Sequence, residues 1–193
     1  MEKQTKALNI PWGDERLQAV TGVGLITSNG KHGHNIMAAE WTHHVSYEPG
    51  LIAVHIGPHK ATAENIAETK EFGVSIASEK QNVLASVAGG QSGKQYDKIA
   101  ALKELGYKFY KAKKLDVMMV EETATNTECR LVDKIKIGDH TMFVGEVVAL
   151  SGSSERPVVY HHGKYWKTGE QIMKPSQEEL DRIKMVIEKH RKR

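Results

Sequence analysis

Apolar residues alternate with polar ones, or form short β-branched runs, through much of the chain, and this pattern predicts β-strands. The strand-like runs cover residues 18–27, 32–47, 51–57, 72–77, 115–121, 128–137, 140–150, 157–160 and 165–166. Asn29-Gly30 follows the first run and predicts a tight hairpin turn, because both turn positions require positive φ.

A smaller part of the chain has a helical pattern, at residues 62–71, 81–88, 94–105 and 176–189. Gly106 predicts the end of the third helix. Ser176 and Glu179 form a capping box at the start of the last helix. That helix carries one apolar stripe, made of Leu180, Ile183, Val186 and Ile187. The stripe predicts that the helix packs on the body of the protein or on a second subunit.

The order of these elements predicts the fold class. Strands follow one another with a few short helices between them, and no regular strand–helix repeat is present. This order favours a mainly β fold, a β-barrel with peripheral helices, over a doubly wound sheet. At 193 residues the chain is long enough for one domain. We expect an N-terminal arm at residues 1–16, the barrel domain at 17–170 and the C-terminal helix at 171–193.

Composition and charge narrow the class of protein. Hydrophobic residues make up 39% and charged residues 26% of the chain, as in an ordinary soluble protein. No apolar run approaches the roughly 20 residues that span a bilayer, and the N-terminus lacks the apolar core of a signal peptide, so a cytoplasmic protein is expected. The net charge of +3 comes from the basic C-terminus, residues 189–193. The rest is close to neutral, which argues against nucleic-acid binding.

Cys129 is the single cysteine, so the chain has no internal disulfide and no Cys-x-x-Cys redox pair. It lies in an alternating strand pattern and is expected to be a small core residue. Any redox chemistry must therefore come from a bound cofactor.

Two glycine-rich segments do not meet the requirements of nucleotide-binding loops. Gly22-Val23-Gly24 is followed by β-branched residues rather than by the helix that a dinucleotide loop needs. In the segment 89–94, Ala88 replaces the first glycine of a P-loop and Gln95 replaces the magnesium-binding Ser or Thr.

The junction at residues 57–62 connects a strand to a helix and predicts an anion site. A helix start exposes unpaired N–H groups and the positive end of the helix dipole. Lys60 adds a positive charge and Thr62 a hydroxyl, so a phosphate is the expected ligand. The alternative is that Thr62 only caps the helix while Lys60 lies in solvent.

The order of motifs around this junction resembles a known family. Asn35-x-Met37, then Trp41, Val45-Ser46 and Glu48-Pro49, precede the Lys60-x-Thr62 segment. Matching segments continue at 71–76, 93–98, 138–147 and 157–165. Over residues 17–168 the sequence resembles the flavin reductase-like, FMN-binding split-barrel family.

The resemblance implies a homodimeric split β-barrel of Greek-key type that binds FMN, with FAD as the alternative flavin. The implied activity passes electrons from NAD(P)H through the flavin to free flavin, ferric complexes or a protein acceptor. Such chemistry needs no protein nucleophile and no metal. The protein is expected to supply donors for the phosphate, walls for the ring and partners for the pyrimidine edge.

The resemblance also implies site residues. The pocket-forming segments contain Thr27, Ser28, Asn35, Ala38, Trp41, Thr42 and His43, and the phosphate-binding segment contains Lys60 and Thr62. A further group either closes the phosphate side or comes from the second subunit: Ser92, Gly93 and Lys98. His140 is the matching histidine nearest the nicotinamide or substrate side. The alternatives are a core aromatic for Trp41, a solvated helix face for Lys98 and a strand-end histidine for His140.

Two other functions stay open at this stage. One is a flavoredoxin-like electron carrier that binds flavin without NAD(P)H activity. The other is a metal enzyme, because His32-x-His34 with Glu40 offers two imidazoles and a carboxylate, which suit iron, manganese or zinc. The adjacent pairs His43-His44 and His161-His162 are poor chelates because their side chains point to opposite faces of a strand.

Overall fold

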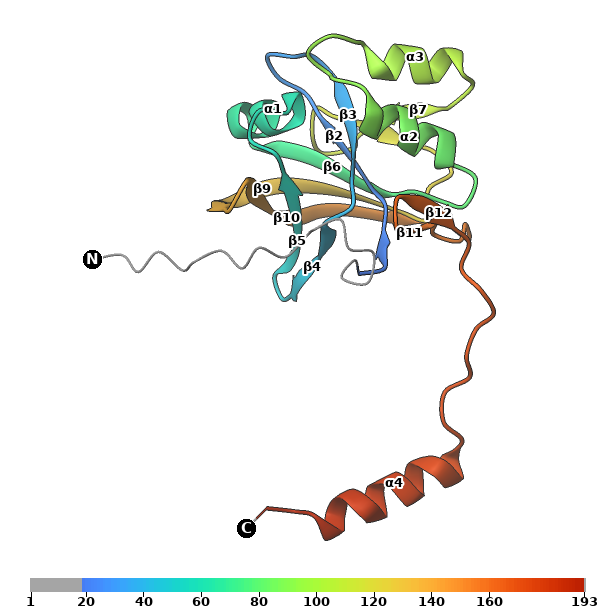
Figure 1. Cartoon of the computed structure of the whole chain (residues 1–193). Coiled ribbons are helices and arrows are strands. Elements are labelled where there is room, and N and C mark those ends of the chain that lie inside the picture. The colour runs from blue at the N-terminus through green and yellow to red at the C-terminus, as the bar shows by residue number, and fades with distance from the viewer. Residues whose placement is uncertain (1–18, 193) are drawn as a thin grey trace, which may run out of the picture.

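A computed structural model describes residues 19–192 of the chain. Its centre is a seven-stranded antiparallel sheet in the order β3-β2-β6-β9-β10-β5-β4 (Figure 1). The strands of this sheet are β2 (Gly24–Ser28), β3 (Asn35–Ala39), β4 (Thr42–Tyr47), β5 (Gly50–Ile56), β6 (Glu71–Ile76), β9 (Thr125–Ile137) and β10 (His140–Gly152). The mainly β class predicted from the sequence is confirmed.

The sheet closes on itself because of a short connection. β3 and β4 stand at opposite ends of the strand order, yet only Glu40 and Trp41 lie between them in the chain. A link of two residues brings the two edges together, so the sheet must curl into a barrel. At this seam Gly24 of β2 lies against Thr42: a Cβ added to Gly24 would be 2.4 Å from Thr42 Oγ1.

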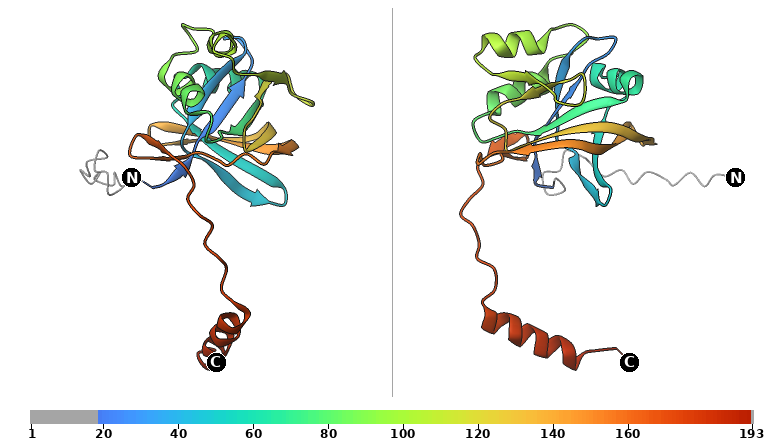
Figure 2. Two further views of the ribbon diagram at one scale, coloured as in Figure 1. Left: turned by 90° about the vertical axis from the view of Figure 1, so that its right-hand side faces the viewer. Right: turned by 180° about the vertical axis from the view of Figure 1, so that it is seen from behind.

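Smaller elements surround the barrel (Figures 1 and 2). β1 (Thr21–Gly22) pairs with the hairpin of β11 (Val159–His161) and β12 (Lys164–Trp166), and β7 (Phe109–Lys111) pairs with β8 (Met118–Val120). The helices are α1 (Ala61–Thr69), α2 (Asn82–Gly90), α3 (Lys98–Glu104) and α4 (Gln177–Lys189). None of the helices among residues 19–192 is long and apolar enough to cross a membrane.

The two faces of β2 build two separate cores. Ile26 points into the barrel, where it joins Phe72 and Phe143. Its neighbour Leu25 points outward and packs with Leu84 under α2 and α3. Successive side chains of a strand point to opposite faces, so a strand that is covered on both sides is buried throughout, as β2 is.

Cys129 is fully buried in the barrel core, as predicted. Burial raises the pKa of its thiol to about 12, because the low-dielectric interior disfavours the charged thiolate. The residue is therefore an unreactive packing group.

Asn29-Gly30 does not form the predicted two-residue turn. β2 and β3 do make a hairpin, with Ser28 paired to Asn35, but residues 29–34 form the loop. Positive φ occurs there at Gly30 and Gly33, and not at Asn29. The loop is longer because it reaches α1, where Asn65 Oδ1 accepts a hydrogen bond from the backbone N–H of His32 at 3.0 Å.

Other elements differ from the predictions at their ends. The third helix begins at Lys98 rather than at residue 94, because Asp97 caps it by accepting from the N–H of Ala100 at 2.9 Å. It ends before Gly106, which has a φ of 93°, as predicted. β7, at Phe109–Lys111, was not predicted. The expected arm at 1–16 lies outside the described residues.

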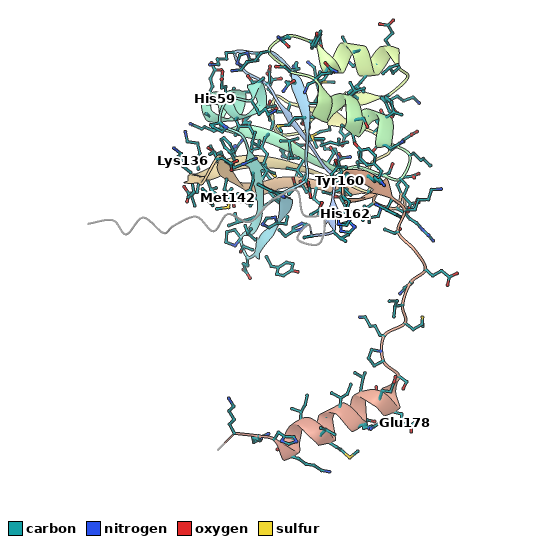
Figure 3. The ribbon with its side chains drawn as sticks, in the orientation of Figure 1. His59, Lys136, Met142, Tyr160, His162 and Glu178 are labelled. Carbon is teal, nitrogen blue, oxygen red and sulfur yellow. The ribbon has the colours of Figure 1, made fainter. Side chains whose placement is uncertain are left out.

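α4 has the predicted capping box at Ser176 and Glu179, but no residue of the helix is buried. Its apolar stripe, including Ile183 at 46% exposed, faces solvent within this chain. Figures 1 and 2 show α4 standing away from the barrel, and Figure 3 shows its side chains, with Glu178 labelled, well apart from those of the barrel. Packing on its own barrel is not observed, so a second subunit remains the prediction.

We expect Gly145→Ala to destabilise the barrel. Gly145 lies at a register shift of β10, and an added Cβ would be 2.4 Å from Cζ of Phe72. Overpacking of this kind costs about 1–3 kcal/mol, so thermal denaturation should show a melting temperature lower by several degrees. Gly169→Ala is the matched control, because nothing lies within 4 Å of the added atom. Equal melting temperatures for the two variants would contradict the packing at this position.

Candidate functional site

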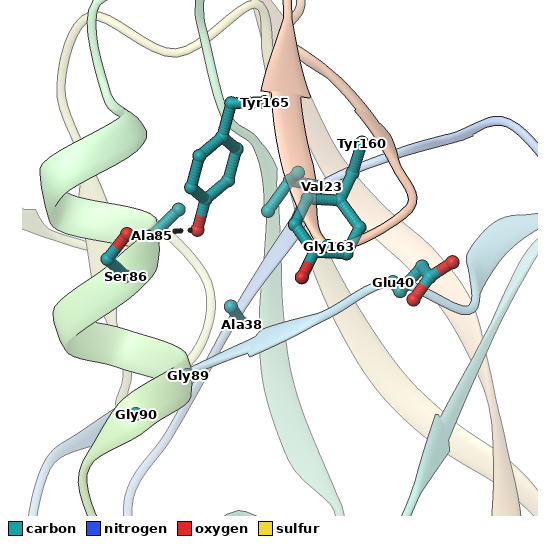
Figure 4. A pocket seen from close by; sticks show the side chains of 10 residues that line it. All are labelled: Val23, Ala38, Glu40, Ala85, Ser86, Gly89, Gly90, Tyr160, Gly163 and Tyr165. Atoms are coloured by element: carbon teal, nitrogen blue, oxygen red, sulfur yellow. Dashed lines mark hydrogen bonds between the residues drawn. The ribbon is translucent and has the colours of Figure 1, made fainter. Parts of the chain in front are cut away.

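A hollow of about 440 Å³ runs along β3 and is shown in Figure 4. We call it the β3 hollow; it is lined by Val23, Ala38, Glu40, Ala85, Ser86, Gly89, Gly90, Tyr160, Gly163 and Tyr165. Its walls are β3, the end of α2 and the β11–β12 hairpin. The volume lies in the range of small-molecule and cofactor sites, about 300–1,000 Å³. A Cβ added to Gly89 would be 3.3 Å from Cβ of Ala38, so the glycine lets α2 approach β3 closely.

A second hollow of about 490 Å³ lies at the seam of the barrel. We call it the rim hollow; it is lined by Val20, Thr21, Gly22, Glu40, Trp41, Thr42, His43 and His55. Glu40 lines both hollows. The short β3–β4 link therefore lies between the β3 hollow and the rim hollow and forms part of the wall of each.

Trp41 forms the centre of a group of flat rings on this rim. Its ring centroid is 4.8 Å from that of His140, and His55 approaches its edge at 6.3 Å. His43 stacks on His55 at 5.5 Å. Trp41 is 43% exposed, so the core-aromatic alternative is wrong. The predicted site residues Trp41, His43 and His140 are thus brought together by β4, β5 and β10.

His140 is fixed by its neighbour in the chain. Its Nδ1 lies 2.8 Å from Oδ1 of Asp139. This hydrogen bond, together with the charge of the imidazole, lowers the pKa of the Asp139 carboxyl. The ring is thereby held beside Trp41, at the start of β10.

The start of α1 lacks a side-chain cap. Lys60 is the N-cap residue, has an extended backbone and makes no capping hydrogen bond. Thr62 does not cap the helix either, because it is buried and its Oγ1 accepts from Nδ2 of Asn35 at 2.8 Å. The capping alternative for Thr62 is therefore wrong. A helix N-terminus beside an exposed lysine suits an anion.

Two residues predicted for the pocket, Ser28 and Asn35, lie near this helix start with Thr62 of the predicted phosphate segment, and their side chains bond within the protein. Asn65 Nδ2 donates to Ser28 Oγ at 3.2 Å, beside the Asn35–Thr62 pair. Gly93 packs against the side chain of Asn35, since a Cβ added to Gly93 would be 2.2 Å from Oδ1 of Asn35. These polar side chains are buried. They fix the loops around the helix start, where Lys60 is exposed.

Lys98 is also buried, at 3% exposed, so the solvated-face alternative is wrong. Its Nζ donates to the carbonyls of Ala88 at 2.9 Å and Gln91 at 3.0 Å, which closes the C-terminal end of α2. Burial, and secondly the charge of Lys60, lowers the pKa of Lys98 to about 8. The lysine holds the glycine-containing end of α2 against β3.

Two other predicted residues, Thr42 and Ser92, make internal hydrogen bonds, whereas the hydroxyl of a third, Thr27, makes none among the described residues. Thr42 Oγ1 donates to the carbonyl of Ala39 at 3.0 Å and fixes the β3–β4 link. Ser92 Oγ accepts from the N–H of Lys94 at 3.3 Å in the loop after α2. Thr27 is fully buried in β2, and its Oγ1 has no hydrogen-bond partner within the described part of the chain.

The two histidines proposed as metal ligands contact different carboxylates. His32 Nε2 lies 2.7 Å from Glu64 Oε2, and His34 Nε2 lies 4.0 Å from Asp116 Oδ1. Glu40 lines the two hollows instead. Among residues 19–192, no three or more His, Cys, Asp or Glu side chains are grouped to hold a metal ion.

The sequence did not single out the aromatic wall of the β3 hollow. The Tyr160 and Tyr165 rings are 5.2 Å apart, and Ser86 Oγ donates to the Tyr165 hydroxyl at 3.2 Å. Burial, then the charges of Tyr165 and Glu40, raises the pKa of Tyr160. Two sequence features could have pointed to this wall: the Gly89-Gly90 pair and the two tyrosines that flank a turn. Taken alone, they predict only a helix end and a hairpin.

Comparison with known proteins agrees with this geometry. The sequence model described as "Flavin reductase like domain" matches residues 17–169. An uncharacterized protein of Archaeoglobus fulgidus is 32% identical over 135 residues, which cover 70% of this chain and 69% of that protein.

Solved structures give the same result. Flavin reductase PheA2 in its native state has 28% identity and a TM-score of 0.67, with 79% of this chain and 92% of that chain covered. Flavoredoxin from Methanosarcina acetivorans has 23% identity and a TM-score of 0.72, with coverage of 82% and 90%. The predicted split-barrel fold is confirmed, and the chain belongs to the flavin reductase-like domain family.

Proposed function

We propose that this protein binds FMN and is an oxidoreductase that takes electrons from NAD(P)H. The bound flavin would accept a hydride and deliver electrons to free flavin, a ferric complex or a protein acceptor. The observation that carries the proposal is the β3 hollow. It combines an edge strand, a glycine-lined helix end and two tyrosines in one space of cofactor size.

The edge position of β3 supports binding of the flavin ring. In the seven-stranded sheet β3 pairs only with β2, so half of its backbone N–H and C=O groups point away from that ladder. Ala38 has a small side chain, which lets a flat ring approach the strand. The outward N–H groups are then donors for the polar pyrimidine edge, where negative charge gathers on reduction.

The start of α1 supports binding of the phosphate. Its uncapped N–H groups and the exposed ammonium of Lys60 form a cationic corner. Ser28, Asn35 and Thr62 position the loops and the helix that form this corner, through their buried hydrogen bonds. In this proposal they support the phosphate site without touching the ligand.

The rim hollow supports binding of the nicotinamide ring beside the flavin. Trp41 and His140 offer aromatic faces next to Glu40, where the two hollows adjoin. A nicotinamide held there would be excluded from water on one side. In this proposal His140 positions the nicotinamide ring. No side chain of the protein is assigned a proton transfer.

An electron carrier without NAD(P)H activity is the second candidate. The similarity to a structure named flavoredoxin favours it. Its flavin site would be the same, so only the reaction with nicotinamide separates the two functions.

The protein mixed with FMN should show shifted or quenched flavin absorption. Lys60→Ala should weaken the affinity for FMN about ten- to hundredfold, because a charge-assisted contact with the phosphate is lost. Fluorescence titration measures both. Lys111→Ala, an exposed lysine in β7 that lines none of the hollows described above, is the control and should bind FMN as the wild type does. Unchanged FMN affinity in the Lys60 variant would show that the phosphate does not bind at the start of α1.

Anaerobic addition of NADH or NADPH to the FMN-loaded protein should bleach the flavin band, as followed in a stopped-flow spectrophotometer. Trp41→Ala should slow the bleaching, because the nicotinamide loses its aromatic support, while dithionite should still reduce the flavin at once. A wild-type protein that binds FMN and stays oxidised with both nicotinamides would instead be the electron carrier.

We further propose that the stripe of α4 packs on a second subunit in a homodimer. Ile183→Glu should then shift the protein toward monomer, because a charge would be buried in the contact. Met185→Glu is the control, since Met185 lies on the opposite side of the helix and is also exposed. Light scattering after size-exclusion chromatography gives the masses. A dimer that is unchanged by Ile183→Glu would leave α4 outside the subunit contact.

A further inference from the structure

The barrel wall formed by β4, β5, β10 and β9 carries apolar and aromatic side chains on its outward side. Strand pairing sets His55 of β5 opposite Met142 of β10, and Met142 opposite Ile135 of β9. Side chains that are paired in this way point to the same face of a sheet. That face is the outward one, because Phe143, next to Met142, points into the barrel core. We call this set the outer face: Trp41, His55, Ile135, Ile137, His140 and Met142.

The outer face is exposed although it is largely apolar. Trp41, Ile135 and Ile137 are 43%, 40% and 48% exposed. An antiparallel sheet with one face in water normally carries polar side chains on that face. The helices α1, α2 and α3 make their main contacts with β2 and β3 instead. Contiguous exposed apolar side chains of this kind mark an interaction site.

A long arm separates α4 from the barrel. Thr168 anchors the start of this arm, because its backbone N–H and its hydroxyl donate to Oε1 of Glu79 at 2.8 and 2.9 Å. Residues 169–176 contain no helix or strand, and Ile172 among them is 91% exposed. Eight residues can span about 26–29 Å. The arm is therefore long enough to carry α4 to a neighbouring molecule.

α4 requires a packing partner. A helix of 13 residues is only marginally stable alone in water, and most helical stability in proteins comes from the packing of an apolar face. No residue of α4 is buried within this chain. Figures 1 and 2 show the helix well away from its own barrel. The stripe of α4 is therefore expected to lie on another copy of the protein.

The charges of α4 and of the outer face are complementary. Three of the first five residues of the helix are acidic: Glu178, Glu179 and Asp181. The β9 segment that carries the outer face has two exposed lysines, Lys134 and Lys136, against one carboxylate, Asp133. The imidazoles of the outer face add positive charge when they are protonated. Opposite charges of this kind steer association and fix the register of a contact.

We propose that α4 of a second copy packs its stripe on the outer face and thereby forms a wall of the rim hollow. Trp41 and His55 belong to both the outer face and the rim hollow, so a helix on this face also covers the hollow. Each copy gives its helix to the other, as the two-fold symmetry of a homodimer requires. The inference rests on the homodimer and the nicotinamide site proposed above, and it names the surface that α4 covers.

Disulfide trapping in the full-length protein tests this contact. Cys129 is buried and the pKa of its thiol is raised to about 12, so it does not react with introduced cysteines. The double variant Ile135→Cys/Ile183→Cys should give a covalent dimer under mild oxidation, as seen on a non-reducing gel. Ile135→Cys/Met185→Cys is the matched control, because Met185 lies on the opposite side of the helix. This control and both single variants of the first pair should remain single chains.

Loss of the contact should also affect the reaction with the nicotinamide. Ile135 belongs to the outer face but does not line the rim hollow. Ile135→Glu should raise the KM for NAD(P)H about tenfold, because the wall supplied by α4 is lost, while the affinity for FMN stays unchanged. Lys111→Glu in β7 is the matched control and should keep the wild-type KM. An unchanged KM in the Ile135 variant would show that α4 does not cover the rim hollow.

The outcomes separate the inference from the proposals on which it rests. A disulfide within one chain would show that α4 folds back on its own barrel, and a covalent dimer of the Ile135→Cys single variant would show that two outer faces meet directly. Each of these results would overturn the inference. A wild-type dimer whose Ile135→Cys/Ile183→Cys variant does not cross-link would also overturn it and leave the homodimer in place. A monomeric wild type would overturn the homodimer as well. Failure to bind FMN would instead overturn the proposed flavin function and leave the cross-linking result unchanged.

Discussion

The two-residue link between β3 and β4 is the constraint on which the site depends. It joins strands from opposite ends of the sheet order, so the sheet must close. Closure puts Trp41 on the rim next to His140, which is a hundred residues away in sequence. It also leaves the outer edge of β3 unpaired by any strand of the barrel, and α2 and the β11–β12 hairpin come to flank that edge. The β3 hollow and the rim hollow are both consequences of this seam.

Buried polar pairs hold the loops around the barrel in place. Asn35 and Thr62 connect β3 to α1, and Asn65 connects the same helix to Ser28. Leaving one partner of such a buried pair unsatisfied typically costs about 1–3 kcal/mol. Replacing any one of these side chains therefore disturbs the helix start as well as the pair itself. These motif residues therefore fix the start of α1 through buried hydrogen bonds.

The sequence predicted the strands well because their two-residue period is a local property. It predicted the start of α4 for the same reason, from a capping box, whereas α2 continues through Gly89 and Gly90, where its end was expected. It was wrong about the Asn29-Gly30 turn because distant Asn65 pulls that loop onto α1. The burial of Lys98 had no local signal either, since its partners are carbonyls at the end of another helix. The wall formed by Tyr160 depends on where the barrel closes.

The charges of Lys60 and Lys98 interact, which would couple protonation to binding of an anion at the proposed phosphate corner. Lys98 is buried, and the charge of Lys60 adds to the effect of burial in lowering its pKa to about 8. An anion at the start of α1 offsets the repulsion between the two ammonium groups and so raises the pKa of Lys98. By linkage, protonated Lys98 then favours the anion to the same extent. In the proposed site, the buried ammonium that holds the end of α2 would therefore also favour the anion while it is protonated, below a pH of about 8.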